Sequence, residues 1–70
     1  MIYKWYEIWV DESTQIPYVL FLLPDDSGAM LVIDPKQSNQ IINKLPDYNA
    51  AVLWLTEDEY TRVNGRMKIE

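Results

Sequence analysis

The sequence predicts a small α+β fold, a single domain over residues 1–70 in the order β-β-β-α-β-α. We expect an antiparallel three-stranded meander plus a fourth strand, with two short helices on one face. Three apolar runs of strand length, at 2–10, 18–23 and 29–33, predict the meander. Helix-capping patterns beginning at Asp34 and Thr56 predict the helices. A chain of 70 residues leaves no room for a second domain.

The first predicted strand, residues 2–10, is dense in aromatic and β-branched side chains. Successive strand side chains point to opposite faces of a sheet. One face therefore carries Ile2, Lys4, Tyr6, Ile8 and Val10, and the other carries Tyr3, Trp5, Glu7 and Trp9. The second set forms an aromatic stripe interrupted only by Glu7.

The next two strands are predicted to form a hairpin. Residues 18–23 are apolar without interruption and lie between Pro17 and Pro24, as expected for a central strand buried on both sides. Residues 24–28 contain two aspartates and Gly28, which favour a turn. Residues 29–33 then resume the apolar pattern and predict the third strand.

A helix is predicted to begin after Asp34. Asp34 fits an N-cap, Pro35 fits the first helical position, and Gln37 stands at the capping-box position. Apolar side chains recur at helical spacing up to residue 45, and Pro46 ends the element. We expect a loop at 47–49 and the fourth strand at 50–55.

The end of the chain allows two interpretations. In the preferred one, Thr56 and Glu59 form a capping box, and Asn64-Gly65 ends a short terminal helix. In the alternative, Asp47 caps a helix that runs to about Asp58. Asn64-Gly65 is then a type I′ turn between strands at 60–63 and 66–69.

Composition excludes several classes of function. The chain has no Cys and no His, which removes thiol nucleophiles, disulfides, thiolate zinc sites and imidazole-based triads. A net charge of −5 disfavours binding to nucleic acid or to anionic membranes. Neither a secretory signal nor an apolar run of membrane-spanning length occurs. We therefore expect a cytoplasmic protein without cofactor or metal.

The aromatic stripe is the strongest functional feature of the sequence. Trp and Tyr dominate the energetic centres of protein interfaces, and two short helices cover only one face of a four-stranded sheet. We therefore predict that Tyr3, Trp5, Glu7 and Trp9 bind a partner protein, and that the chain self-associates as a non-catalytic adaptor or inhibitor. The alternative interpretation places this stripe in the core.

Two other functions stay open as alternatives. Acidic groups at 11–12, 25–26 and 57–59 could mimic nucleic acid and block a DNA-binding protein, although turns and a helix start also explain them. A small enzyme could have a site formed only in an oligomer. In that case Glu7 and Asp34 are the carboxylates nearest the predicted apolar strand surface. The basic residues Arg62, Arg66 and Lys68 are expected at a helix C-terminus.

Overall fold

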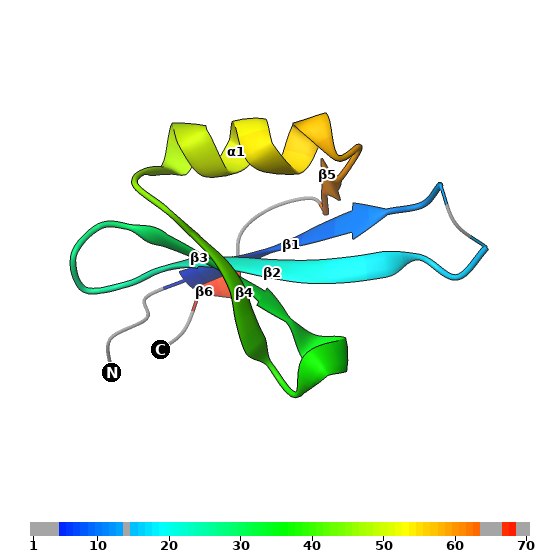
Figure 1. Ribbon diagram of the computed structural model, residues 1–70, viewed down its shortest axis with the longest axis horizontal. Helices are drawn as coiled ribbons and strands as arrows, with labels where there is room; N and C mark the ends of the chain where they lie inside the picture. The colour runs from blue at the N-terminus through cyan, green and yellow to red at the C-terminus, as the bar shows by residue number, and fades with distance from the viewer. Residues whose placement is uncertain (1–4, 14, 64–66, 69–70) are drawn as a thin grey trace.

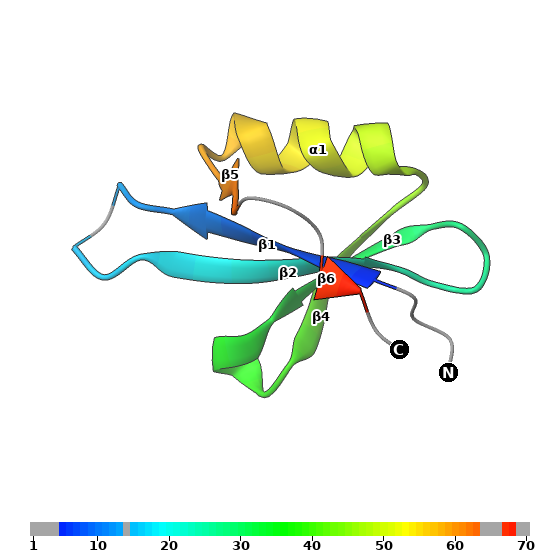
Figure 2. The same cartoon turned by 180° about the vertical axis from the view of Figure 1, so that it is seen from behind.

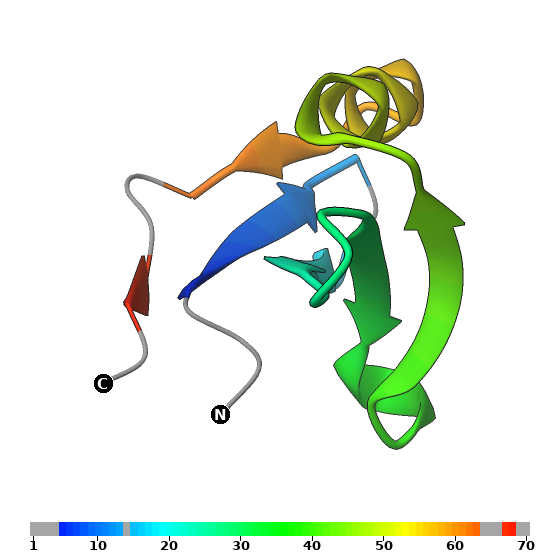
Figure 3. The same cartoon turned by 90° about the vertical axis from the view of Figure 1, so that its left-hand side faces the viewer.

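The computed structural model describes residues 5–13, 15–63 and 67–68, and places one α-helix on one face of a curved antiparallel sheet (Figures 1 and 3). The strands are β1 (Trp5–Asp11), β2 (Tyr18–Pro24), β3 (Met30–Asp34), β4 (Gln40–Leu45), β5 (Thr61–Arg62) and β6 (Met67–Lys68). The helix α1 spans Tyr48–Glu57, and a 3₁₀ turn, η1, spans Pro35–Gln37. The α+β class is confirmed.

All described strand pairs are antiparallel, and the sheet order is β4-β3-β2-β1-β5. The short β6 also pairs with β1, so the two short strands lie along the same edge of β1. β1 and β2 run side by side along the long axis of the molecule (Figures 1 and 2). The first three strands pair in chain order, but the predicted three-stranded meander is wrong in extent, because β4, β5 and β6 also join the sheet.

The turn between β2 and β3 follows the local chemistry of its sequence. The amide of Asp25 donates to the carbonyl of Ala29 at 2.9 Å, and the Asp25 carboxylate accepts the Ser27 amide at 2.8 Å. Gly28 has φ of 90°, a conformation that a residue without a side chain adopts at no steric penalty. The predicted hairpin is confirmed.

The helix predicted after Asp34 is wrong beyond its first turn. The Asp34 carboxylate does accept the Lys36 amide, at 2.9 Å. Ser38 and Asn39 then take φ of 58° and 60°, which ends η1 after three residues. The following residues form β4, in which Ile41 pairs with Ile33 of β3. The β-branched side chain of Ile41 favours a strand. Since β4 ends at Leu45, Pro46 does mark a boundary.

The strand predicted at 50–55 is also wrong, because these residues lie within α1. The predicted loop at 47–49 contains the cap, since the Asp47 side chain accepts the Ala50 amide at 2.8 Å. The hydroxyl of Thr56 donates back to the Val52 carbonyl inside the helix, so Thr56 is not a cap. The alternative interpretation was right about this helix.

The second predicted helix does not form over the described part of 56–63. Thr61 and Arg62 pair instead with Val10 and Trp9 of β1. The proposed Asn64-Gly65 turn lies outside the described residues. Both β5 and β6 pair with β1, so this part of the chain extends the sheet rather than covering it.

The core lies between the sheet and α1. Its buried members are Trp9, Leu20, Leu22, Met30, Val32, Ala51 and Leu55. Ala51 and Leu55 are one helical turn apart, so they present one face of α1 to the sheet. Among the described residues, no helix is long and apolar enough to span a membrane.

Candidate functional site

The described members of the predicted partner-binding set, Trp5, Glu7 and Trp9, lie on the face of β1 that α1 covers. Trp9 is 4% exposed and Glu7 is fully buried, while Trp5 packs against the same core. The ring of Trp5 meets Tyr48 of α1 edge-on, with centroids 6.1 Å apart. Tyr3 lies outside the described residues. The expectation that this face is open is therefore corrected, because the helix capped by Asp47 lies over it.

Glu7 lies at the junction of three elements. The Tyr48 hydroxyl donates to both carboxylate oxygens, at 2.8 and 3.0 Å, and the Trp9 indole donates at 3.2 Å. Arg62 of β5 completes the site with a guanidinium nitrogen 3.4 Å from Oε2. A buried carboxylate requires such donors and a compensating charge. Glu7 therefore ties α1 and β5 to β1.

Asp34 is the second buried carboxylate, and its partners come mostly from neighbouring residues. Its Oδ2 accepts hydrogen bonds from the Tyr18 hydroxyl and from Gln37 Nε2, the latter at 2.7 Å. The Tyr18 hydrogen bond holds the pKa of Asp34 below its ordinary value of 3.8, although burial opposes this effect. The same bond raises the pKa of Tyr18. The ammonium of Lys36 lies 5.1 Å from the centre of the Tyr18 ring.

Both buried carboxylates are hydrogen-bonded within the fold. Every buried side-chain nitrogen and oxygen among the described residues has a hydrogen-bond partner. Glu7 and Asp34 were the two acids singled out from the sequence, and they are the buried polar side chains of the described chain. Both therefore act in this fold as anchors for other elements.

The other side of the strands forms what we call the open face. Strand register places there the side chains of Tyr6, Ile8, Val10, Val19, Phe21, Leu23, Leu31, Ile33 and Ile41. Leu23 and Leu31 are buried, yet neither belongs to the core packed against α1. No helix in the described part of the chain lies over this face (Figure 3).

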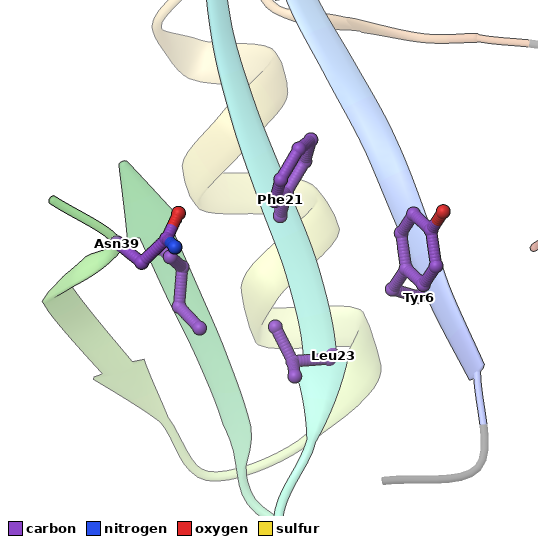
Figure 4. Close-up of a pocket in the computed structure, with 5 residues that line it drawn as sticks. Tyr6, Phe21, Leu23 and Asn39 are labelled. Carbon is purple, nitrogen blue, oxygen red and sulfur yellow. The ribbon is translucent and has the colours of Figure 1, made fainter. Parts of the chain in front are cut away.

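A shallow hollow lies on the open face. It has a volume of about 290 Å³ and is lined by Tyr6, Phe21, Leu23, Ile33 and Asn39. Figure 4 shows the labelled side chains projecting from the side of the strands away from α1. The rings of Tyr6 and Phe21 are 5.8 Å apart and tilted by 54°. The Asn39 amide is the main polar group at the hollow.

The open face carries a charged side chain on its edge strand β4. Lys44 lies opposite Leu31, and its ammonium is 3.3 Å from the Asp25 carboxylate. Among the open-face residues there is no acid, although the chain carries a net charge of −5. The centre of the face is therefore apolar and its rim is charged, the pattern of protein interfaces.

The acidic and basic groups noted in the sequence mainly satisfy local structure. The Asp11 carboxylate accepts the Ser13 hydroxyl and amide, and these bonds lower its pKa. Of the three expected basic residues, Arg62 pairs with Glu7. Arg66 and the side chain of Lys68 lie outside what the structure describes. The described residues contain no group of acids that could hold a metal ion.

The sequence contained a signal for the open face. Alternation along β1 already separated Tyr6, Ile8 and Val10 from the aromatic stripe. The tryptophans of the aromatic stripe are of a residue type that is highly buried on average, which favours the core for that stripe and leaves Tyr6, Ile8 and Val10 for the other face. No protein-family model, curated protein or solved structure matches this chain.

Proposed function

We propose that this chain is a non-catalytic protein-interaction module that works through its open face, and that a second copy of the chain covers that face. The observation that carries the proposal is the apolar surface spread over four strands with no helix of the described chain above it. The largest apolar patch of a soluble protein is often functional. A cytoplasmic setting is part of the same proposal.

The size of the face supports a weak dimer rather than a permanent one. Strands of this length and number span roughly 20 Å by 19 Å, or about 400 Å² in projection. A standard interface buries about 800 Å² of each partner, and transient ones bury less. The open face therefore corresponds to a small interface, and we expect the homodimer to be reversible.

Charge supports a face-to-face arrangement. Two copies each carrying −5 repel one another, so contact is favoured where acids are absent. The open-face residues include no acid, whereas α1 and its flanking turns contain Asp47, Glu57 and Asp58. The dimer is expected to tighten as added salt screens the remaining repulsion.

Sedimentation equilibrium over a range of concentrations tests the proposal. The wild-type chain should shift from monomer to dimer, and Phe21→Glu should remain a folded monomer. Val19→Glu, a second substitution on the same face, tests the interface independently in case Phe21→Glu fails to fold. Leu53→Glu is the matched control, because Leu53 is an apolar side chain of α1 that is 61% exposed.

A wild-type chain that stays monomeric at millimolar concentration would overturn self-association. A dimer that is weakened by Leu53→Glu but not by the two open-face variants would move the interface to α1. Circular dichroism of each variant establishes that the chain is folded before its mass is interpreted.

A further inference from the structure

We propose that Ile41 of each copy inserts into the hollow of the other copy, so that the dimer contains two equivalent contacts. This inference rests on the proposed function, since it specifies how two open faces meet. Ile41 lies opposite Ile33 in the sheet register and is 51% exposed. It is therefore an apolar side chain that protrudes beside the hollow that Ile33 helps to line.

The arrangement follows from two-fold symmetry. In a symmetric dimer, if residue i of one copy contacts residue j of the other, then j also contacts i. A protruding side chain and a hollow that lie side by side on one face satisfy this condition when the axis passes between them. Ile41 and the hollow between Phe21 and Ile33 are such a pair.

The chemistry of the hollow favours a side chain over a small-molecule ligand. Its volume of about 290 Å³ lies at the lower limit of ligand pockets, which run from about 300 to 1,000 Å³. Ligand pockets also place several polar groups around their occupant, whereas four of the five residues that line this hollow are apolar or aromatic. An isoleucine side chain has no polar group, so it requires no hydrogen-bond partner from the hollow.

The bulge in β4 supplies a matched control. Register shifts between Val32 and Ile33, so Asn43 lies opposite Val32 and Ile41 opposite Ile33. Ile42 is the extra residue between them and is 38% exposed. Ile42 is thus chemically identical to Ile41 and adjacent to it, but it has no cross-strand partner on the open face.

The experiment compares Ile41→Asp with Ile42→Asp by sedimentation equilibrium. We expect Ile41→Asp to raise the dissociation constant at least about 100-fold, because each dimer loses two buried isoleucines. Ile42→Asp should change it by less than about threefold. Isotope-filtered NOE spectra of a mixed labelled and unlabelled wild-type sample should connect Ile41 methyl groups to the rings of Tyr6 and Phe21 across the interface.

The outcomes separate this inference from the proposed function. If the wild type dimerises and Phe21→Glu abolishes the dimer while Ile41→Asp does not, face-to-face packing stands and the insertion of Ile41 is refuted. If Ile42→Asp weakens the dimer as much as Ile41→Asp, the copies pair through the edge of β4 instead. A monomeric wild type refutes both ideas.

Discussion

The two faces of the β1–β2 pair have the same strands and the same twist, yet they are completed differently. On the covered face, α1 packs over Trp9 and Leu22, and Glu7 is satisfied by donors from three elements. On the open face, Phe21 and Tyr6 contact each other across the strands, and no described helix lies above them. The covered face holds the fold together, whereas no helix of the described chain covers the open face.

The comparison also shows where polar groups can be buried. Both buried carboxylates belong to the covered face, since Asp34 follows Val32 at strand spacing and bonds to Tyr18, which packs against the core. A buried charge is tolerated only where fixed donors surround it. The open face has no buried carboxylate, in agreement with this rule.

The largest expected effect comes from placing a charge on each face in turn. Trp9→Glu should unfold the chain, because a carboxylate would enter the core beside Glu7 without a partner. Phe21→Glu should leave a folded monomer. One-dimensional proton NMR distinguishes the two outcomes by the dispersion of methyl signals. A folded Trp9→Glu variant would show that the covered face is not the core.

Truncation of adjacent residues gives the next effect. Leu22→Ala should lower the free energy of unfolding by about 2–5 kcal/mol, because Leu22 is fully buried. Phe21→Ala should lower it by only about 1–2 kcal/mol in dilute protein, because that side chain is half-buried. Urea denaturation measures both.

Protein concentration sharpens this second comparison. Association stabilises the folded state by mass action, so the effect of Phe21→Ala should grow as concentration rises, whereas that of Leu22→Ala should not. Equal effects of the two substitutions at every concentration would contradict a difference between the faces.

A smaller effect is expected at Glu7. Glu7→Gln removes the charge that Arg62 neutralises and places an amide group against two donors, Tyr48 and Trp9. We expect a loss of about 1–3 kcal/mol in unfolding free energy. Glu12→Gln, at an exposed acid just after β1, is the control and should change it by less than about 0.5 kcal/mol. If Glu7→Gln leaves the free energy of unfolding unchanged, the hydrogen-bond network of Glu7 does not anchor β5.

The contrast between Glu7 and Asp34 explains how much of the site could be predicted. Asp34 bonds to the amide two residues later and to Gln37, so the capping pattern in the sequence indicated its role. Glu7 depends on Tyr48 and Arg62, which lie 41 and 55 residues away. No local sequence pattern predicts partners so far along the chain. Only the position of Glu7 among aromatic residues indicated that it is buried.

The fold was predictable to a similar extent. The first three strands followed from alternation and turn residues, which act over a few positions. Residues 50–55 did not, because an apolar run of six suits a strand or a buried helix, and both Asp47 and Thr56 match capping patterns. Packing of Ala51 and Leu55 on the core decided the matter, and that contact is not visible in the sequence.

The smallest expected effect is the pH dependence that Asp34 contributes. Its pKa is lowered in the folded chain, mainly by the Tyr18 hydrogen bond, so the folded state favours the ionised carboxylate. This contribution is present above the ordinary value of 3.8 and is lost as pH falls through the lowered value. Tyr18 shows the opposite sign, since its pKa is raised and its contribution is lost only as pH rises past 10.0 through the raised value.

Carbon-detected NMR titration of the Asp34 carboxylate, in the wild type and in Tyr18→Phe, measures this effect. Tyr18→Phe should raise the pKa of Asp34 toward 3.8, because the hydrogen bond that lowers this pKa most is removed, while those from Gln37 and the Lys36 amide remain. Asp25, whose pKa is lowered by Ser27 in a separate turn, should titrate identically in both proteins and is the internal control. If Asp34 in the wild type titrates at or above 3.8, the Tyr18 bond does not favour its charge. Acid would then not weaken the end of the sheet where β3 meets η1.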